Sequence, residues 1–326
     1  MEVIYGSEKF VSGDGSLTRF GKNVSKNRPL TQTAVGLGNF DGLHIGHMAL
    51  VHALIEEAKK CSLKSMVYTF LNHPNDIINK TLSTGLLMST DTKIKLLAEA
   101  GLNSVCLEEF DKEFSKTTAE DFVKDVLVGR LNARLVAVGF NYRFGRDGAG
   151  DVEFLKKAAK VYGFNVLVIA PVMLDGDVVS STQIKRRIIN GEVERSAELL
   201  GRNYSLSGIV QRGEGIGKNI GFATANIKAE ENAVLPKRGV YATEVIIDGK
   251  TFKSVTNIGR NPTLGISTGV VIETHVIDFD GDLYDRRIEI FFRFRIRDEK
   301  KFDGLGQLAI QIQSDIRESR DKLLRI

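Results

Sequence analysis

The chain has 326 residues, of which 42% are hydrophobic and 26% charged, and its net charge is +4. This length favours two domains, and this composition is that of an ordinary globular protein. The small positive charge suits anionic ligands, but it is too weak to indicate nucleic acid or a membrane surface as a partner.

The two cysteines, Cys61 and Cys106, lie far apart and lack the spacing of a metal site. They exclude a disulfide framework and favour a reducing compartment. The N-terminus has no apolar signal core, and no apolar run reaches the roughly 18 residues of a membrane span. We therefore expect a soluble, cytoplasmic protein that is a monomer or a weak homo-oligomer.

Strand and helix patterns alternate from Ala34 to Leu200, after one short strand pattern at 2–5. The predicted strands are 34–37, 65–70, 104–108, 134–139 and 165–169, and the predicted helices are 46–60, 90–100, 119–131, 151–162 and 181–200, the last broken near Gly191. The capping-box spacing of Thr118 and Asp121 supports a helix start there. This alternation predicts an α/β domain with a parallel sheet covered on both faces.

The ten residues 38–47 join a predicted strand to a predicted helix. Their three glycines allow a tight turn and a close ligand, and the amides and dipole of the helix start favour an anion. His44 and His47 are three residues apart and share one face of the first turn. The stretch predicts a phosphate cradle; a metal-binding pair and a turn with a satisfied histidine pair are the alternatives.

Three further polar clusters lie at 69–74, 139–146 and 180–186, two directly after predicted strands and the third at the start of a helix. Taken alone, each has a plain structural explanation: a proline turn, a mobile loop, and a capped helix with a basic face. Ligands of parallel sheets bind beyond the carboxyl ends of the strands. A nucleotide site shared by these clusters is therefore the better explanation.

From about Tyr204 onwards, short strand patterns replace helical spacing. The predicted strands at 205–211, 239–247, 251–257, 270–278 and 286–296 indicate a small antiparallel barrel or sandwich. The last strand alternates basic and apolar residues, which indicates one core face and one solvated face rather than a nucleic-acid site. An amphipathic helix is predicted at 303–323.

A glycine-rich stretch at 213–226 carries the second chemical signal. Its backbone amides and Lys218 suit phosphates, while the side-chain oxygens of Thr224 and Asn226 suit Mg²⁺. A mobile hairpin is the alternative explanation for a single glycine-rich loop.

Glu273 and His275 point the same way from a strand rich in Val and Ile, and a polar turn after a strand is predicted at 257–263. If the face that carries Glu273 is turned inward, this carboxylate is a candidate general base. A solvent-facing pair at a barrel edge is the alternative.

Four motifs of the first half together resemble the N-terminal module of prokaryotic FAD synthetases, of the nucleotidyltransferase superfamily marked by H-x-G-H. They are G-x-F-D-G-x-H-x-G-H, T-F-x-x-H-P, G-x-x-x-R-F-G and S-S-T-x-I-[KR], within roughly 34–203. The resemblance implies a Rossmann-like domain at 1–203 with His44 and His47 as catalytic residues. It implies ATP binding by Gly38, Asn39, Phe40, Asp41, Gly42, His44, Gly46, His47, Ser181, Thr182, Lys185 and Arg186, and flavin binding by Asn72, His73, Pro74, Asn141 and Phe144.

The motifs G-x-x-T-A-N, N-I-G-x-x-P-T, E-x-H and D-L-Y resemble the riboflavin kinase module of the same family, over about 204–322. The resemblance implies a kinase domain at 204–326, a small β-barrel with a terminal helix, in which Glu273 is the catalytic base. It implies Mg²⁺ binding by Thr224 and Asn226, and ATP binding by Gly215, Gly217, Lys218, Gly221, Thr224, Asn226 and Asn257.

This chain departs from the family at four positions. Lys185 and Lys218 replace arginines, Ala223 replaces a proline, and Asp285 replaces a glycine. Lysine keeps the charge but loses the bidentate fork, for which Arg186 could substitute beside Lys185. Without the proline, the segment before Thr224 has more conformational freedom, but no catalytic atom is lost.

The combined motifs predict a bifunctional enzyme that uses Mg²⁺ and ATP to convert riboflavin to FMN and FMN to FAD. One alternative is an FMN adenylyltransferase whose kinase module is impaired. A second is a related transferase that acts on another phosphorylated acceptor, and a third is a flavin-binding protein without turnover.

Overall fold

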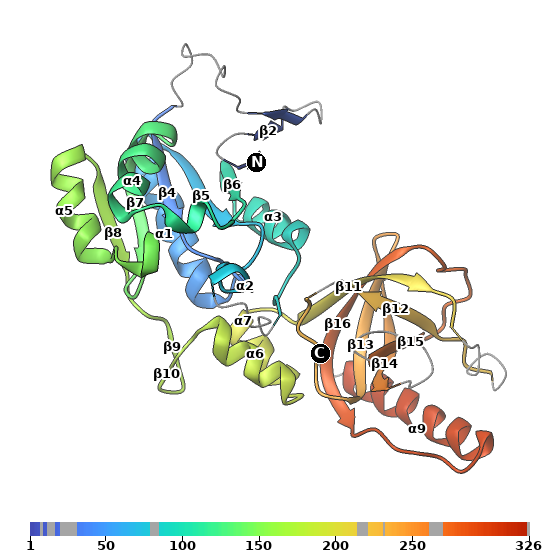
Figure 1. Ribbon diagram of the computed structural model, residues 1–326. Coiled ribbons are helices and arrows are strands. Elements are labelled where there is room, and N and C mark those ends of the chain that lie inside the picture. Colours follow the sequence, from blue (N-terminus) through green and yellow to red (C-terminus); the bar gives the residue numbers. More distant parts are fainter. Residues whose placement is uncertain are drawn as a thin grey trace. The chain divides into compact units, whose positions relative to one another are not determined.

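The computed structural model describes residues 1–6, 9–11, 17–19, 31–78, 85–213, 221–230, 232–260 and 270–324 (Figure 1). The chain folds into two compact units. The first comprises Met1–Ser83 and Thr90–Ser180, and the second comprises Thr84–Ser89 and Ser181–Ile326. The division after residue 203 that the sequence predicts falls at a different place. As a division into functional modules it stays a prediction.

The first unit is built on a sheet with the strand order β3-β2-β1-β6-β5-β4-β7-β8. From β1 to β8 in this order, all neighbouring strands are parallel, which confirms the predicted parallel sheet. A short antiparallel hairpin, β2–β3, which was not predicted, extends the β1 edge. The strands are β1 (Glu2–Tyr5), β2 (Lys9–Val11), β3 (Leu17–Arg19), β4 (Thr33–Leu37), β5 (Lys64–Phe70), β6 (Ser104–Glu108), β7 (Ala133–Gly139) and β8 (Asn165–Ile169).

The helices of this unit follow the predicted pattern with two differences. The predicted helix 119–131 is one α-helical turn followed by a π-helix, and three short helices, at 74–78, 114–116 and 146–148, were not predicted. Thr118 caps the first turn, because its hydroxyl accepts the amide of Asp121 at 3.1 Å. The helices are α1 (Ile45–Lys60), α2 (Pro74–Ile78), α3 (Thr90–Glu99), η1 (Phe114–Lys116), α4 (Ala119–Asp121), the π-helix η2 (Phe122–Arg130), η3 (Arg146–Gly148) and α5 (Val152–Tyr162).

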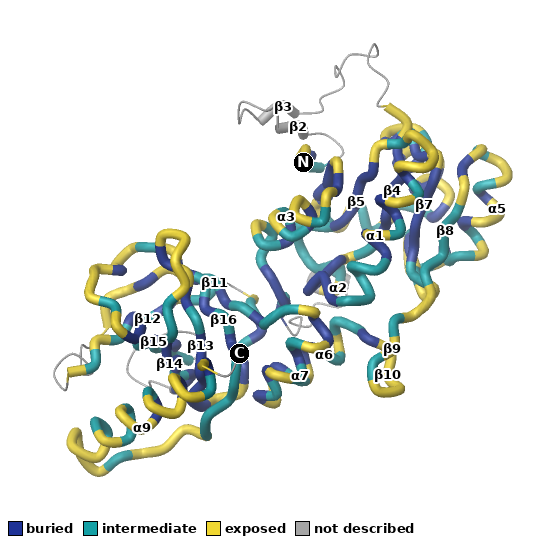
Figure 2. The backbone as a smooth tube through the Cα atoms, turned by 180° about the vertical axis from the view of Figure 1, so that it is seen from behind, coloured by how far each residue is buried: buried dark blue, intermediate teal, exposed yellow. Residues whose placement is uncertain are grey.

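The central strand β4 is buried along its whole length, because helices cover both faces of the sheet (Figure 2). Val35 and Leu37 point into a core cluster that η2 and α5 share. Gly36 points the other way, and a methyl group on it would lie 3.0 Å from Leu54 and 3.1 Å from Leu50 of α1. The missing side chain thus lets α1 approach the strand that leads into the 38–47 turn.

The second unit is a closed antiparallel barrel with the strand order β11-β12-β15-β14-β13-β16. The sequence predicts five of these strands and misses β12. The barrel is accompanied by α6 (Ser181–Ile189), α7 (Val193–Leu200) and α9 (Leu305–Leu323), and its strands are β11 (Tyr204–Gln211), β12 (Ala225–Ala229), β13 (Gly239–Ile247), β14 (Lys250–Arg260), β15 (Val270–Val276) and β16 (Arg287–Arg297). The predicted terminal helix is confirmed, and a barrel rather than a sandwich forms.

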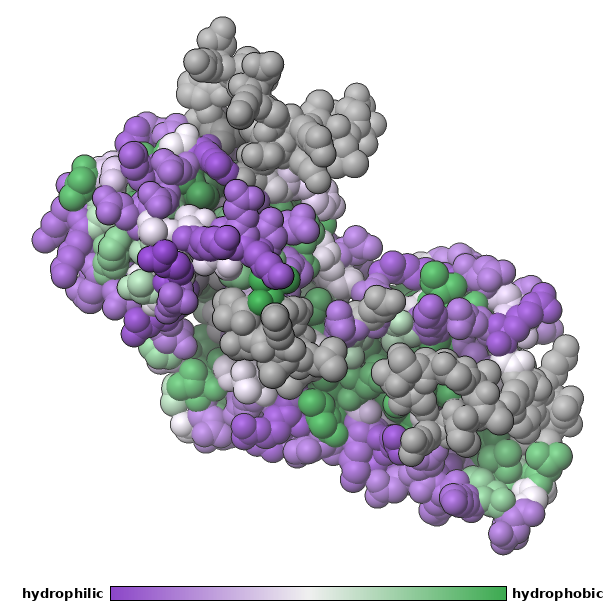
Figure 3. Space-filling view, viewed as in Figure 1, coloured by the Kyte–Doolittle hydropathy of each residue, from purple (hydrophilic) through white to green (hydrophobic). Residues whose placement is uncertain are grey.

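Hydrophilic residues cover most of the face drawn in Figure 3, and the hydrophobic residues on it form smaller groups. Among the described helices, none is long and apolar enough to cross a membrane. Of the two cysteines, Cys61 is exposed and Cys106 is buried, and neither forms a disulfide.

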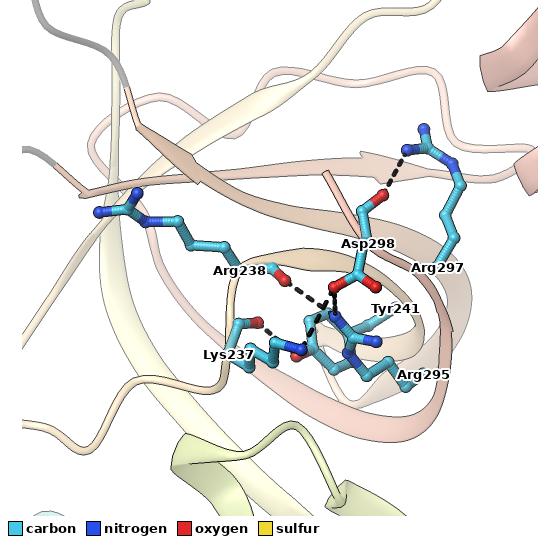
Figure 4. A network of polar contacts seen from close by, with 6 residues as sticks. All are labelled: Lys237, Arg238, Tyr241, Arg295, Arg297 and Asp298. Atoms are coloured by element: carbon cyan, nitrogen blue, oxygen red, sulfur yellow. Dashed lines mark hydrogen bonds and ion pairs between the residues drawn. The ribbon is translucent and has the colours of Figure 1, made fainter. Parts of the chain in front are cut away.

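Arg295 of β16 joins the α6–α7 pair to the barrel. Its backbone amide donates to Glu194 of α7 at 3.0 Å, and its guanidinium donates to Asp298 at 2.7 Å and to the Arg238 carbonyl at 3.0 Å. Figure 4 shows this guanidinium and the Lys237 ammonium converging on Asp298. These contacts fix α7, and through it α6, within the second unit.

Candidate active sites

The stretch 38–47 forms the turn between β4 and α1, at the carboxyl end of β4. Phe40, Asp41, Leu43 and His44 are all buried in it. The φ angles of Phe40 and Leu43 are positive, at 48° and 37°. Left-handed backbone at a residue other than glycine costs roughly 1–3 kcal/mol and persists only where the surroundings impose it. The turn is therefore a buried element whose conformation depends on its neighbours.

The two predicted imidazoles meet in this turn. His44 is the N-cap of α1, because its Nδ1 accepts the amide of His47 at 3.2 Å. The rings stack with centroids 3.6 Å apart, and the Phe40 ring lies 5.3 Å from that of His47. A neutral imidazole that accepts at Nδ1 carries its proton on Nε2, so His44 can donate from Nε2.

The three glycines of the turn are required for different reasons. Gly42 has a φ angle of 84°, which suits glycine. At Gly38 and Gly46 there is too little space for a side chain. A methyl group on Gly38 would lie 3.1 Å from the Phe40 ring, and one on Gly46 would lie 3.2 Å from the His44 ring. Gly46 therefore makes room for the imidazole that caps the helix.

Two side chains outside the predicted set hold the turn in place. The Thr69 hydroxyl, on β5, donates to the Asn39 carbonyl at 2.9 Å, and the Lys93 ammonium, on α3, donates to the same carbonyl at 3.1 Å. Sequence reasoning missed both residues. Thr69 belongs to a motif that was chosen for its histidine and proline, and Lys93 lies in a predicted helix, on whose surface a lysine is usually exposed to solvent.

The predicted flavin residues after β5 make local structural contacts. The Asn72 amide pairs with the backbone of Phe110, donating at 2.8 Å and accepting at 2.9 Å. His73 Nδ1 accepts the amide of Asn75 at 3.2 Å, and Pro74 is the first residue of α2. Asn72 thus joins the segment after β5 to the segment after β6, and its contact with flavin stays a prediction.

Phe144 and Asn141 differ in exposure. Phe144 is buried, with its ring 5.5 Å from that of Phe122 and 5.8 Å from those of Tyr142 and Phe154. Asn141 is exposed. From Phe122 the cluster continues by edge contacts of 5.2–6.4 Å through Phe114, Phe110 and Phe70. Of these, Phe70 belongs to the T-F-x-x-H-P motif, and the sequence did not single out the others.

Four of the residues predicted to bind ATP in adenylyl transfer belong to α6, in the second unit. Ser181 is the first residue of this helix; Thr182 and Arg186 are exposed, whereas Lys185 is buried. Arg186 is therefore the more accessible of the two cations. The position of these four residues relative to the 38–47 turn stays a prediction.

Three predicted kinase residues form a row across neighbouring barrel strands. Glu273 of β15 is directly opposite Asn226 of β12 on one side and Asn257 of β14 on the other. Cross-strand partners point to the same face of a sheet, so the carboxylate lies between two amides. Because Ile272, Thr274 and Val276 are buried, this row lies on the outer face of the barrel and is half-buried. From the sequence, the general-base interpretation of Glu273 depended on an inward-facing side chain, and this side chain faces outward. The prediction that Glu273 is a base therefore depends on the flanking Asn226 and Asn257 instead.

The segment that carries Thr224 is attached to this row. The His275 ring, through Nδ1, forms a 2.8 Å hydrogen bond with the Ala223 carbonyl, and it lies 5.8 Å from the Phe222 ring. Gly221 has a φ angle of 89°. Gly215, Gly217 and Lys218 lie outside the described residues, so their predicted contacts with ATP stay predictions.

Gly213 gives Asn226 its space. A methyl group on Gly213 would lie only 2.0 Å from the Asn226 amide nitrogen. The end of β11 and the start of β12 thus meet closely at the row. Asn257 lies within β14, not in a turn after it.

Comparisons with known proteins cover both units. The sequence pattern of the FAD synthetase family matches residues 26–183, and that of the riboflavin kinase family matches residues 200–323. A "bifunctional riboflavin kinase/FMN adenylyltransferase" of Escherichia coli K12 is 36% identical over 287 residues, which are 87% of this chain and 91% of that protein. A protein of the same name from Listeria monocytogenes is 33% identical over 92% of this chain and 97% of its own length.

The fold has a counterpart over its whole length. A crystal structure from Streptococcus pneumoniae, described as a macrolide-efflux protein, superposes with a TM-score of 0.83 at 26% identity. The match covers 98% of this chain and 99% of that one. The two-part architecture is therefore known from a solved structure.

Proposed function

The chain belongs to the bifunctional riboflavin kinase/FMN adenylyltransferase family, and on this premise we propose how its residues divide the two reactions. It converts riboflavin and ATP to FMN and ADP, and FMN and ATP to FAD and pyrophosphate. The 38–47 turn serves adenylyl transfer, and the Asn226–Glu273–Asn257 row serves phosphorylation. The observation that carries this division is the strand register that sets one carboxylate between two amides.

In adenylyl transfer, a phosphate oxygen of FMN attacks the α-phosphorus of ATP, and pyrophosphate leaves. The nucleophile is already an anion, so the site needs charge stabilisation rather than a base. The first amides of α1 and the Nε2 donor of His44 supply it at the helix N-terminus. His47, stacked on His44, holds that ring in its donating orientation.

In phosphorylation, the ribityl hydroxyl of riboflavin attacks the γ-phosphorus of ATP, and ADP leaves. The nucleophile is a neutral alcohol, so a base must accept its proton, and Glu273 takes this role. Asn226 and Asn257 flank its carboxylate and orient it. The base is thus needed in this reaction alone.

Magnesium fits the oxygen donors near this row. Thr224 and Asn226 offer a hydroxyl and an amide oxygen, which are ligands that this hard cation accepts. When bound, Mg²⁺ neutralises phosphate charge. The cytoplasmic location and the monomeric or weakly associated state stay predictions.

Half-reaction assays of two variants test this division. We expect Glu273→Gln to lower FMN formation at least about a hundredfold and to leave FAD formation from FMN unchanged. His47→Ala should do the reverse by a similar factor. His52→Ala, at an exposed histidine of the same helix, is the matched control and should alter neither rate. Equal loss of both activities in either variant would contradict the division.

A further inference from the structure

Lys93 of α3 reaches into the base of the 38–47 turn. Its ammonium donates to the Asn39 carbonyl at 3.1 Å, the Phe70 carbonyl at 3.4 Å and the Thr69 hydroxyl at 3.5 Å. These acceptors belong to two different segments, the turn after β4 and the end of β5. One cation therefore connects the predicted phosphate turn to the strand that leads into the predicted flavin segment.

The ammonium is buried, with 7% of the residue exposed. Burial lowers its pKa to about 8, and the nearby Asp41 carboxylate opposes this by favouring the charged form. Near neutral pH the turn therefore contains a mostly protonated cation. Burying a charge is costly, and an apolar residue of the same size would pack at less cost.

The hydrogen bond to Asn39 alone does not account for this choice. The Thr69 hydroxyl already donates to the Asn39 carbonyl, so a second hydrogen bond is not needed to satisfy it. A positive charge at this place would stabilise anions that bind at the adjacent helix N-terminus. Electrostatic interactions are stronger there than in water because the surroundings are buried.

We propose that Lys93 is a positioning residue for adenylyl transfer, which fixes the phosphate turn against β5 and places a buried positive charge behind the bound polyphosphate. This role rests on the proposed function of the turn. Lys93 acts through Asn39, which belongs to the same turn as the two histidines, and it need not touch the reacting atoms. A small displacement of such a turn can cost about a hundredfold in rate.

The test compares Lys93→Met, which keeps the length and removes the charge, with Lys93→Arg, which keeps the charge. Lys95→Met removes an exposed lysine from the same helix and is the matched control. We expect Lys93→Met to lower kcat/KM for ATP in adenylyl transfer about a hundredfold, with riboflavin phosphorylation by the same chain unchanged. Lys93→Arg should recover at least tenfold of this loss, and Lys95→Met should match the wild type.

The wild-type pH profile supplies a second readout that needs no substitution. The groups that face Lys93 are the Asp41 carboxylate, the Asn39 and Phe70 carbonyls and the Thr69 hydroxyl. Deprotonation of the ammonium should lower kcat/KM for ATP as the pH rises through about 8. This fall at high pH, the alkaline limb of the profile, should be absent from the kinase reaction and from adenylyl transfer by Lys93→Met.

Three outcomes would overturn the proposal: adenylyl transfer by Lys93→Met within threefold of the wild type, a parallel loss of both activities, or an alkaline limb that survives in Lys93→Met. Failure of the wild type to form FAD is a distinct result. It would refute the proposed function of the turn itself.

Discussion

Buried polar side chains gather where the central parallel strands of the first unit end. Asp41, His44, Thr69, Lys93 and Glu108 are each at most 7% exposed. Glu108 accepts the Tyr68 hydroxyl at 2.9 Å, and burial raises the pKa of that hydroxyl far above its usual range. Such groups are usually exposed, and each buried one requires a partner. Several buried polar side chains at one edge of the sheet therefore indicate a binding site there.

Gly46→Ala tests whether the His44 ring must stay in place. The new methyl group would lie 3.2 Å from that ring and would displace it. We expect FAD formation to fall at least about tenfold, although alanine favours the helix by about 1 kcal/mol over glycine. Measured rates and melting temperatures separate the two effects. Gly306→Ala in α9, where a methyl group meets nothing within 4 Å, is the control and should change neither activity.

The stability contribution of Lys93 should depend on pH. Its pKa is about 8 in the folded chain, against an ordinary value of 10.5. Between these values the unfolded chain still binds the proton and the folded chain does not, so stability rises with pH. Relative to Lys93→Met, the wild type should gain up to about 3 kcal/mol over this range.

Urea unfolding at pH 7.5 and 9.5 measures this difference. Lys95→Met, at an exposed position, should show no such dependence on pH. A difference between wild type and Lys93→Met that is the same at both pH values would contradict the expectation.

At the residue scale, the sequence reveals the two histidines of the turn better than the side chains that hold the turn in place. H-x-G-H is a local pattern, so its glycines and imidazoles could be recognised from spacing. Thr69 and Lys93 act across 30 and 54 residues of chain, and no local pattern reveals such partners. The side chain of Asn72, assigned to flavin from its motif, pairs with the Phe110 backbone for the same reason: its partner is 38 residues away.

At the element scale, the strands that alternate with helices could be predicted almost to the residue. Their runs of apolar residues are long and are separated by clear turn signals. β12 was missed because its five residues directly follow a glycine-rich loop and carry Asn226 and Lys228. The π-helix η2 was predicted as α-helix because both present a similar apolar stripe.

The attachment of α9 to the barrel offers an element-scale test. Arg297 of β16 donates to both oxygens of Asp315 at 2.9 and 2.7 Å, and Asp315 is 3% exposed. Removing one partner of a buried pair leaves the other charge uncompensated. We expect Asp315→Ala to destabilise the second unit by about 3–5 kcal/mol.

The exposed pair of Asp278 and Arg320 is the control for this prediction. Arg320→Ala, within α9, breaks this exposed pair and should cost less than about 1 kcal/mol. The urea concentration at which riboflavin phosphorylation is lost reports the stability of the second unit. A similar shift for both variants would refute the special role of the buried pair.

At the scale of the whole molecule, two chemistries require two kinds of site. Adenylyl transfer starts from an anion and needs hydrogen-bond donors, whereas phosphorylation starts from an alcohol and needs a base. In the division that we propose, the turn at 38–47 supplies the donors and the row at Glu273 supplies the base, in different units. The departures from the family at Lys185, Lys218 and Ala223 remove no residue of the 38–47 turn or of the Glu273 row.

The most direct test of this account is a time course of the wild-type chain with riboflavin, ATP and Mg²⁺, in which FMN and FAD are resolved chromatographically. We predict that FMN forms first and that FAD and pyrophosphate follow from it. Formation of FAD only when FMN is supplied, or accumulation of FMN without any FAD, would contradict the claim that one chain performs both reactions.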